Sequence, residues 1–391
     1  MTTESPGRLR ASSGLRVAVV GLGWMGQVHA RSWARLPQHY PDLGLRPRLV
    51  AAADPVPSLR SIADAYGFET FVGDWRALVA RDDIDVVSVT GPNHVHRDVG
   101  VAVAQAGKHL WIEKPAGRNA GETAQIAAAV QAAGVCSAAG FNYRNAPAVG
   151  LARDLVAEGR LGRLEQVDVR FLADYAAHPE GALSWRFANA TAGSGVLGDL
   201  VCHATDLARY VAGEIVELVV DEGRFIASRP EPAAAGSHFA RGAGPLGPVE
   251  NEDYVGALLR FSSGARGTLT ASRVAVGEQC AYEIVVHGDR GALAWDFRRM
   301  GELRTCLDQD YQDASWSTVL VGRDAGELAR FQPAPGIPLG YDDLKVIEAY
   351  RLVSSIVGDV STGATIDDAL TAARTVEAMA LSIAERRWVT L

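Results

Sequence analysis

Three glycines near the start of the chain are spaced for binding a dinucleotide. Gly21, Gly23 and Gly26 form the pattern G-x-G-x-x-G between a valine-rich run and a stretch of helix-forming residues. In a strand, turn and helix of this kind, the first glycine permits a tight turn and the second lets the backbone approach a pyrophosphate. The third lets helix and strand pack closely while the helix N-terminus faces the anion. An incidental glycine turn is the alternative, but the pattern predicts a cofactor site to which Trp24 and Met25 also contribute.

Asp54 is the acidic residue expected at the end of the next strand. A carboxylate there accepts hydrogen bonds from the ribose hydroxyls and repels a 2′-phosphate, so NAD is favoured over NADP. Asp54 follows Gly26 at more than the usual spacing of about 20 residues, and the proline-containing loop 37–47 can absorb the excess. A capping aspartate at a helix start is the alternative, because aspartate is a preferred N-cap residue.

A second candidate segment, Thr90–His96, leaves the strand expected at 86–90. Doubly wound sheets bind ligands at the carboxyl ends of their strands, so Thr90 and Pro92 are expected to lie against the cofactor. We expect Asn93 to cap the following helix. His96 is either a further cofactor contact or simply a residue of the first helical turn.

Glu113-Lys114-Pro115 ends the strand expected at 109–112. Pro115 stops the strand and restricts Lys114 to an extended conformation, so the lysine side chain is aimed outward from the sheet. A fixed ammonium beside a substrate hydroxyl stabilises the developing alkoxide and can relay its proton. Taken alone, a lysine at a strand end is more often solvated surface.

Asp199 and His203 are spaced four apart in a stretch with helical character, so they share one helix face. Histidine can accept a proton near neutral pH and a nearby carboxylate can orient it, which suits removal of a hydroxyl proton during hydride transfer. A metal site is the rival chemistry, but two ligands without a third at a recognisable spacing are weak evidence for it. If the pair stood alone, a capping aspartate and a core histidine would be the better explanation.

Composition excludes several classes of partner. The 391 residues are 48% apolar and 21% charged, as expected for a globular protein of two domains. A net charge of −8 disfavours nucleic acid and anionic membrane surfaces. The polar N-terminus has no apolar core of signal-peptide length, and no segment has the ~18 uninterrupted apolar residues of a membrane span. We therefore expect a cytoplasmic protein, and four cysteines without C-x-x-C pairing indicate free thiols rather than a zinc site or disulfides.

The order of apolar runs predicts two domains of different architecture. A Rossmann domain is expected at 1–140, after a flexible tail at 1–14, because short β-branched runs alternate there with helical periods. Its strands are expected at 17–20, 49–53, 86–90, 109–112 and 135–139. From 141 to 391 we expect an α+β domain with a large open, mainly antiparallel sheet, strands being expected at 164–174, 215–226, 254–261, 266–271, 281–287 and 292–296. The loops 228–251 and 308–340 are left unassigned, and the last helix, 366–386, is expected to pack back on the first domain.

Taken together, these motifs resemble the Gfo/Idh/MocA oxidoreductases over nearly the whole chain. The ordered set comprises G-x-G-x-x-G, Asp54, Pro92-Asn93-x-x-His96, Glu113-Lys114-Pro115, Asn142-Tyr143-Arg144 and Asp199-x-x-x-His203. The resemblance implies a Rossmann domain followed by an α/β domain with an open sheet, and oxidation or reduction of sugars, inositols or related polyols. It also implies that Lys114, Asp199 and His203 are the catalytic set, with Glu113, Lys114 and Asn142 contributing to the cofactor site.

A narrower resemblance, to the levoglucosan dehydrogenases and related sugar 3-dehydrogenases, rests on the segments 141–149, 183–187, 192–199 and 244–249. It implies NAD-dependent oxidation of a secondary hydroxyl, at carbon 3 of a pyranose sugar, anhydrosugar or glycoside. Trp185 offers a flat face to a sugar ring, and Asn142, Arg144 and Arg186 offer donors to hydroxyls. Tyr341, which precedes a closing helix, is added to this substrate-binding set. A core tryptophan and structural arginines are the alternative.

Two other functions remain open at this point. One is inositol 2-dehydrogenase within the same family, and the other is a dinucleotide-binding sensor without catalysis. The intact set Lys114, Asp199 and His203 argues against the sensor. Because one face of an open sheet leaves apolar surface uncovered, a homodimer or homotetramer joined through the sheet faces is expected.

Overall fold

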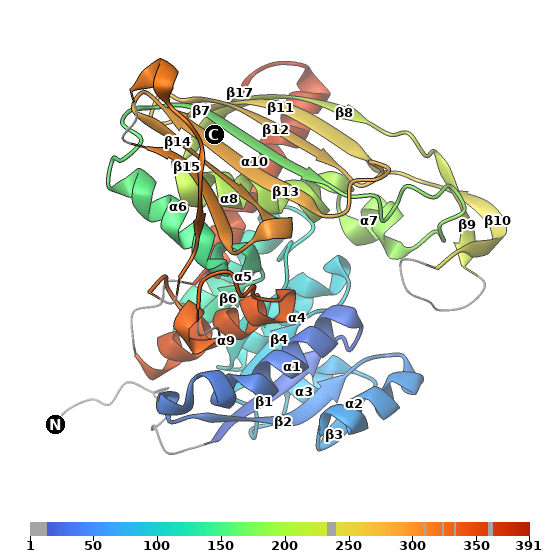
Figure 1. Cartoon of the computed structure of the whole chain (residues 1–391). Coiled ribbons are helices and arrows are strands. Elements are labelled where there is room, and N and C mark those ends of the chain that lie inside the picture. Colours follow the sequence, from blue (N-terminus) through green and yellow to red (C-terminus); the bar gives the residue numbers. More distant parts are fainter. Residues whose placement is uncertain (1–13, 233–239, 308–309, 323, 332–333, 359–362) are drawn as a thin grey trace. The chain divides into compact units, whose positions relative to one another are not determined.

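The computed structural model describes residues 14–232, 240–307, 310–322, 324–331, 334–358 and 363–391 (Figure 1). The chain divides into two compact units. The first comprises the residues up to Asn145 together with Leu339–Leu370, and the second comprises Ala146–Pro338 together with Thr371–Leu391. Residues 1–13 of the expected tail and parts of the loops 228–251 and 308–340 lie outside the described residues, and Gly14 already belongs to the first strand.

The first unit is built on a six-stranded parallel sheet in the order β3-β2-β1-β4-β5-β6. The strands are β1 Gly14–Val20, β2 Arg46–Ala53, β3 Thr70–Val72, β4 Val86–Val89, β5 His109–Ile112 and β6 Ser137–Ala139. The helices are α1 Trp24–His39, α2 Arg60–Tyr66, α3 Trp75–Val79, α4 Asn93–Gln105, α5 Ala120–Ala133 and α9 Tyr341–Val357. Short 3₁₀ helices are η1 Pro41–Leu43, η2 Pro57–Leu59 and η3 Asn142–Asn145.

The strand order confirms the doubly wound Rossmann fold and fixes where a ligand would bind. The order reverses between β1 and β4, which makes their carboxyl ends the topological switch point. The glycine turn follows β1 and the Thr90 segment follows β4, so both lie at this point. All four residues of β4 are buried, as expected for a strand covered by helices on both faces.

The second unit is built on a nine-stranded sheet in the order β16-β15-β14-β13-β7-β12-β11-β8-β17, in which only the β7–β12 pair is parallel. Its strands are β7 Leu164–Leu172, β8 Ile215–Gly223, β11 Tyr254–Phe261, β12 Arg266–Ser272, β13 Ala281–Gly288, β14 Gly291–Asp296, β15 Glu302–Leu307, β16 Ser317–Leu320 and β17 Val389–Thr390. A separate two-stranded ribbon is formed by β9 Ser228–Pro232 and β10 Gly242–Pro248.

Helices of the second unit cover one face of this sheet (Figure 1). The α-helices of this unit are α6 Pro147–Ala157, α7 Asn189–Ala192, α8 Cys202–Ala212 and most of α10 Ile366–Glu385. Its shorter helical segments are the π-helical turn η5 Leu197–Val201 and the 3₁₀ helices η4 Trp185–Phe187, η6 Phe297–Arg299, η7 Tyr311–Asp313 and η8 Leu328–Arg330. α8 packs on β7 and β13. Alternation along β7 explains this, because Val167, Val169 and Phe171 are buried on the helix side while polar residues occupy the other face.

Only the first turn of the last helix, α10, belongs to the first unit, where Ile366 N donates to the Ser137 hydroxyl and Asp368 accepts from Arg144. The helix that returns is α9, which packs against α1, β5 and β6, whereas α10 only begins in the first unit and continues into the second. Two residues in the first turn of α9 explain why this helix packs on α1. Asp342 of α9 accepts hydrogen bonds from Arg31, and Asp343 accepts one from Arg35, one turn further along α1.

Among the described residues, no helix is long and apolar enough to cross a membrane. The same part of the chain contains no group of three His, Cys, Asp or Glu side chains that could hold a metal ion.

Candidate active site

The three glycines of the turn are required for three different reasons. Gly21 has φ +88°, where a side chain is strained, and a Cβ there would lie 2.6 Å from Gly91 N. A Cβ on Gly26 would lie 2.0 Å from the Gly21 carbonyl oxygen, so Gly26 allows the helix to pack closely. Gly23 has φ −65°, which any residue adopts, and apart from its chain neighbours no described atom lies within 4 Å of its would-be Cβ. Glycine is favoured over alanine at this N-cap position, but no contact within the described part of the chain requires it there. The open space beside Gly23 suits the approach of a ligand.

The N-terminus of α1 presents backbone donors at this turn. α1 begins at Trp24 with Gly23 as N-cap residue, and no side chain caps the first turn. The first N–H groups of a helix have no partner within the helix, and together with the helix dipole they attract an anion. The turn therefore fits a pyrophosphate.

The Asp54 carboxylate is buried and holds the glycine turn. Its Oδ2 accepts a hydrogen bond from Leu22 N at 2.8 Å, and its Oδ1 accepts one from Val56 N at 2.9 Å. A carboxylate oxygen can accept more than one hydrogen bond. Asp54 can therefore accept from a ribose hydroxyl while it also fixes the turn.

Thr90 and His96 brace the loops rather than simply facing a ligand. The Thr90 hydroxyl donates to the Gly21 carbonyl at 2.6 Å, which ties the end of β4 to the glycine turn. Both ring nitrogens of the buried His96 lie 2.8 Å from backbone carbonyl oxygens, those of Pro115 and Gly91. His96 thus connects the loops after β4 and β5, a role that the sequence did not predict.

The expected capping role of Asn93 was wrong. α4 begins at Asn93 itself, and the N-cap position is occupied by Pro92, which has no side-chain donor or acceptor to offer. The fixed φ of proline favours this helix entry, here −62°.

Glu113 and Lys114 differ in their surroundings. The Glu113 carboxylate is buried and accepts a hydrogen bond from Lys345 of α9, and it lies 3.0 Å from His29 Nε2 of α1. Lys114 is half-buried, and its peptide bond to Pro115 is cis. The carboxylate therefore faces the interior of the unit.

The residues after β6 form a polar and aromatic group in the first unit. Asn142 in η3 is 1% exposed, and its Nδ2 has no partner among the residues that the structure describes. Arg144 donates to the Asp368 carboxylate at 3.0 Å. The ring of Tyr341 stacks on Trp24 with 5.7 Å between centroids, so the start of α9 lies beside the glycine turn.

In the second unit, Asp199 and His203 lie at the start of the helix that packs on β7 and β13. Asp199 belongs to the π-helical turn η5, and His203 lies in the first turn of α8. The Tyr282 hydroxyl donates to the His203 carbonyl at 2.6 Å, which fixes the helix on the sheet. The Glu252 carboxylate accepts hydrogen bonds from the backbone of residues 195 and 197, so it caps the segment that carries Asp199.

Tyr175 is a site residue to which the sequence assigned no role. Its hydroxyl donates a hydrogen bond to Asp199 Oδ2 at 2.5 Å. Burial and the charge of Asp199 hold the pKa of Tyr175 well above its usual value, so the phenol stays protonated and keeps donating. No spacing pattern links the two residues, because Tyr175 follows β7 and Asp199 lies on η5.

Trp185 and Arg186 form a stacked pair on η4. The Arg186 guanidinium lies 4.3 Å from the centroid of the Trp185 ring, and both side chains are half-buried. Trp185 is therefore not a core residue, and the Arg186 guanidinium covers one face of its ring.

Comparisons with known proteins follow the same division of the chain. Residues 15–141 match the description "Oxidoreductase family, NAD-binding Rossmann fold", and residues 149–294 match "GFO/IDH/MocA C-terminal domain". Levoglucosan dehydrogenase from Pseudarthrobacter phenanthrenivorans is 33% identical over 382 residues, which cover 96% of this chain and 97% of that protein. This chain belongs to the GFO/IDH/MocA family of oxidoreductases.

Solved structures agree with this assignment to the GFO/IDH/MocA family. Levoglucosan dehydrogenase in complex with NADH and levoglucosan has a TM-score of 0.89 at 32% identity, covering 97% of this chain and 99% of that chain. An inositol 2-dehydrogenase from Rhizobium meliloti is 25% identical over 96% of this chain and 99% of its own length. The family resemblance and the fold expected from the sequence are thus confirmed.

For a family member with this Rossmann domain, the residues present fit NAD. The space beside Gly23, the uncapped start of α1 and the unpartnered Asn142 Nδ2 are the three features that a bound dinucleotide would use. Asp54 supplies the carboxylate beside the turn.

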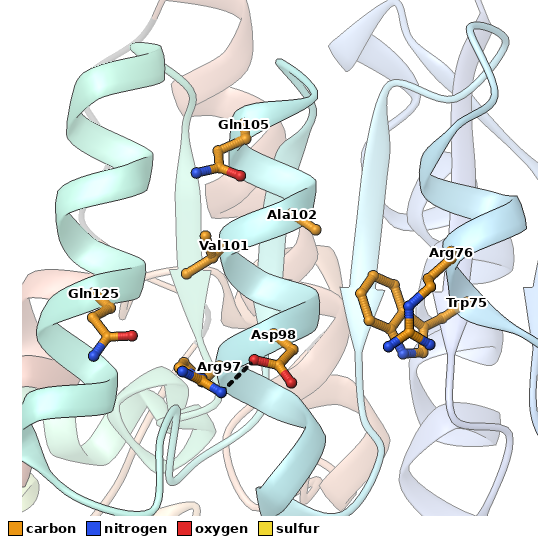
Figure 2. A pocket seen from close by; sticks show the side chains of 8 residues that line it. All are labelled: Trp75, Arg76, Arg97, Asp98, Val101, Ala102, Gln105 and Gln125. Atoms are coloured by element: carbon orange, nitrogen blue, oxygen red, sulfur yellow. Dashed lines mark ion pairs between the residues drawn. The ribbon is translucent and has the colours of Figure 1, made fainter.

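A hollow of about 290 Å³ in the first unit is a different place (Figure 2). Figure 2 shows that its lining comes from α3, α4 and α5, with Arg97 and Asp98 paired at 2.7 Å and Arg76 lying over Trp75. None of the residues predicted for the site lines it, so this hollow is not the candidate active site.

Proposed function

We propose that this oxidoreductase uses NAD to oxidise a secondary hydroxyl, at carbon 3 of a pyranose sugar, anhydrosugar or glycoside, to a ketone. The observation that carries the proposal is the Asp199–His203 segment, which the fold fixes from three sides. Tyr175 holds the Asp199 carboxylate, Glu252 caps the segment and Tyr282 anchors His203. Similarity to levoglucosan dehydrogenase over nearly the full length of both chains supports a sugar as substrate.

Each residue of the proposed set has one task. His203 takes the proton of the reacting hydroxyl, and Asp199 orients it. Lys114 stabilises the negative charge that develops on the oxygen. Bound NAD supplies the hydride acceptor.

Cofactor binding in this proposal rests on the first unit. Gly21, Gly23, Gly26, Trp24 and Met25 surround the pyrophosphate and its ribose. The remaining predicted contacts are Asp54, Thr90, Pro92, Asn93, His96, Glu113, Lys114 and Asn142. The carboxylate of Asp54 makes NAD the preferred cofactor over NADP.

The substrate is tested by offering levoglucosan, simple glycosides and inositols with NAD and with NADP, and following the absorbance of the reduced nicotinamide. The carbon that becomes a ketone is identified by NMR of the product. His203→Ala and Lys114→Ala should each reduce turnover on the best substrate by about 10²–10⁴-fold, the usual contribution of a general acid or base. NADH affinity should change little. Near-wild-type turnover in both variants would remove the catalytic assignment. A wild type that binds NADH but turns over none of these substrates would favour the sensor.

Inositol 2-dehydrogenase is the second candidate, because relatives of that name match the chain over most of its length. Faster turnover of an inositol than of any pyranose would establish it.

We further propose that the protein is a cytoplasmic homodimer or homotetramer joined through the open face of its large sheet. Leu258 of β11 lies on that face and is 52% exposed. Its neighbours Val219 and Thr268 on the adjacent strands face the same side. A monomeric mass in light scattering at micromolar concentration would contradict the assembly.

A further inference from the structure

A cluster of buried charges lies directly behind the strand end that carries Lys114. We call Glu113, Lys345, Glu348, His29 and Trp111 the α9 cluster. Lys345 Nζ donates to Glu113 Oε1 and, at 2.9 Å, to Glu348 Oε1. Trp111 Nε1 donates to the same Glu348 oxygen at 2.6 Å, and the His29 ring stacks on Trp111. The cluster joins α1, β5 and α9 inside the first unit.

The buried charges of the α9 cluster are not explained by a contribution to folding stability. Lys345 is 0% exposed and Glu348 is 2% exposed, so both charges have lost their hydration. A buried ion pair is often no better for stability than apolar residues of the same volume. Two atoms of the cluster, His29 Nδ1 and Glu348 Oε2, also have no partner within the described part of the chain. A role beyond packing would explain why charges occupy this position.

The choice of lysine is itself informative. Among the 38 lysine and arginine residues of the chain, only Lys108, Lys114 and Lys345 are lysines. An ammonium is a compact charge that fits between two carboxylates, whereas a guanidinium is a wide planar fork. Lys345 is therefore suited to holding Glu113 and Glu348 together.

The cluster holds one neighbour of Lys114, and His96 holds the other. The Glu113 N–H donates to the Val89 carbonyl at 2.9 Å. A Cβ on Gly140 would lie 2.6 Å from the Glu113 carboxylate, so that side chain is enclosed on its other side as well. On the far side of Lys114, the Pro115 carbonyl lies 2.8 Å from His96. Lys114 thus sits between two fixed peptide units.

We propose that Lys345 and Glu348 of α9 are positioning residues for Lys114, acting through the Glu113 carboxylate. The proposal rests on the role given to Lys114 in the proposed function. It makes the returning helix part of the catalytic apparatus, although α9 is separated from Glu113 by more than 200 residues of sequence.

The ionisation of Glu348 gives this role a signature in pH. Burial raises the pKa of Glu348 to about 7, and the nearby Glu113 carboxylate adds to this. Although burial works against it, the Lys345 ammonium holds the pKa of Glu113 below its usual range. Burial lowers the pKa of His29, the group that α1 contributes, to about 4. Above neutral pH, ionised Glu348 competes with Glu113 for Lys345, and the support of Lys114 weakens.

The first test needs no substrate. Protein labelled with carbon-13 at the lysine ε position gives three signals, which Lys108→Arg and Lys114→Arg assign. We expect the Lys114 signal to change with pH near 7 in the wild type, to lose that step in Glu348→Gln and to shift in Lys345→Met. Asp342→Asn is the matched control, because it weakens the docking of α9 on α1 without touching Glu113. A Lys114 signal that is the same in all four proteins would overturn the proposal.

The second test uses turnover and separates the two proposals. Lys345→Met should lower kcat by about 10²-fold, the scale expected when a reacting group is misplaced by about 1 Å, with KM and NADH affinity nearly unchanged. In a Lys114→Ala background the same change should have no further effect, because both act through one ammonium. Lys345→Arg should restore only part of the activity. If Lys114→Ala itself keeps full turnover, the proposed function fails; if it is inactive and Lys345→Met is not, only this inference fails.

Discussion

Alanine at Gly23 and at Gly26 should produce opposite effects, because only one of the two glycines touches the protein. A methyl group on Gly23 enters open space and requires no change in φ. Its cost is limited to the loss of a glycine N-cap, about 1 kcal/mol or less of unfolding free energy. A methyl group on Gly26 meets the Gly21 carbonyl oxygen at 2.0 Å, and overpacking of this kind costs about 1–3 kcal/mol or more.

The two variants are compared by thermal unfolding and by NADH titration followed by fluorescence. A unit of this size loses about 2–4 °C in Tm for each kcal/mol. Gly26→Ala should therefore melt several degrees below the wild type, whereas Gly23→Ala should melt close to it. Gly23→Ala should nonetheless bind NADH at least about tenfold more weakly, a loss of ~1.4 kcal/mol. Unchanged NADH affinity in Gly23→Ala would refute the placement of the pyrophosphate, and an unchanged Tm in Gly26→Ala would refute the packing argument.

Three further outcomes are expected. Asp54→Ala should reduce the preference for NAD over NADP by on the order of 1–3 kcal/mol, measured as the ratio of kcat/KM values, and equal efficiency of the wild type with both cofactors would contradict it. Asp253→Asn leaves the buried Arg273 without its carboxylate partner and should cost about 3–5 kcal/mol in urea unfolding, whereas Glu217→Gln, at a more exposed ion pair, should cost less than about 1 kcal/mol. Burial lowers the pKa of His29 to about 4, so the unfolded chain binds a proton more readily between about pH 6.5 and 4. The unfolding free energy should fall as the pH is lowered through that window, and His29→Gln should flatten this slope.

The sequence predicted those elements whose apolar pattern is long enough to stand out. The strand expected at 254–261 has the same limits in the structure. β3 has only three residues, too few for a recognisable alternation. β16 is exposed along its whole length, and β10 consists largely of glycine and proline, so neither carries an apolar period.

The candidate site was predictable where its residues belong to one local segment. The glycine turn, Lys114 and the Asp199–His203 pair are each defined by short spacings that the chain shows directly. Tyr175 and Lys345 are not, because each reaches its partner only through the fold: Tyr175 from the end of β7, and Lys345 from a helix 232 residues further along. Residues so far apart in the sequence show no spacing pattern that would link them before the fold is known.

Several motif residues make their hydrogen bonds to the elements that shape the site. Asp54 and Thr90 both bond to the glycine turn, and Glu113 bonds to α9. A substitution at any of these positions changes the shape of the site as well as its contacts, so a loss of NADH affinity there does not identify a ligand contact. Gly23 and Asn142 differ from these residues. No contact with another described residue requires glycine at Gly23, and the Asn142 amide nitrogen has no partner among the described residues. Substitutions at these two positions therefore give the most direct evidence of where the cofactor lies.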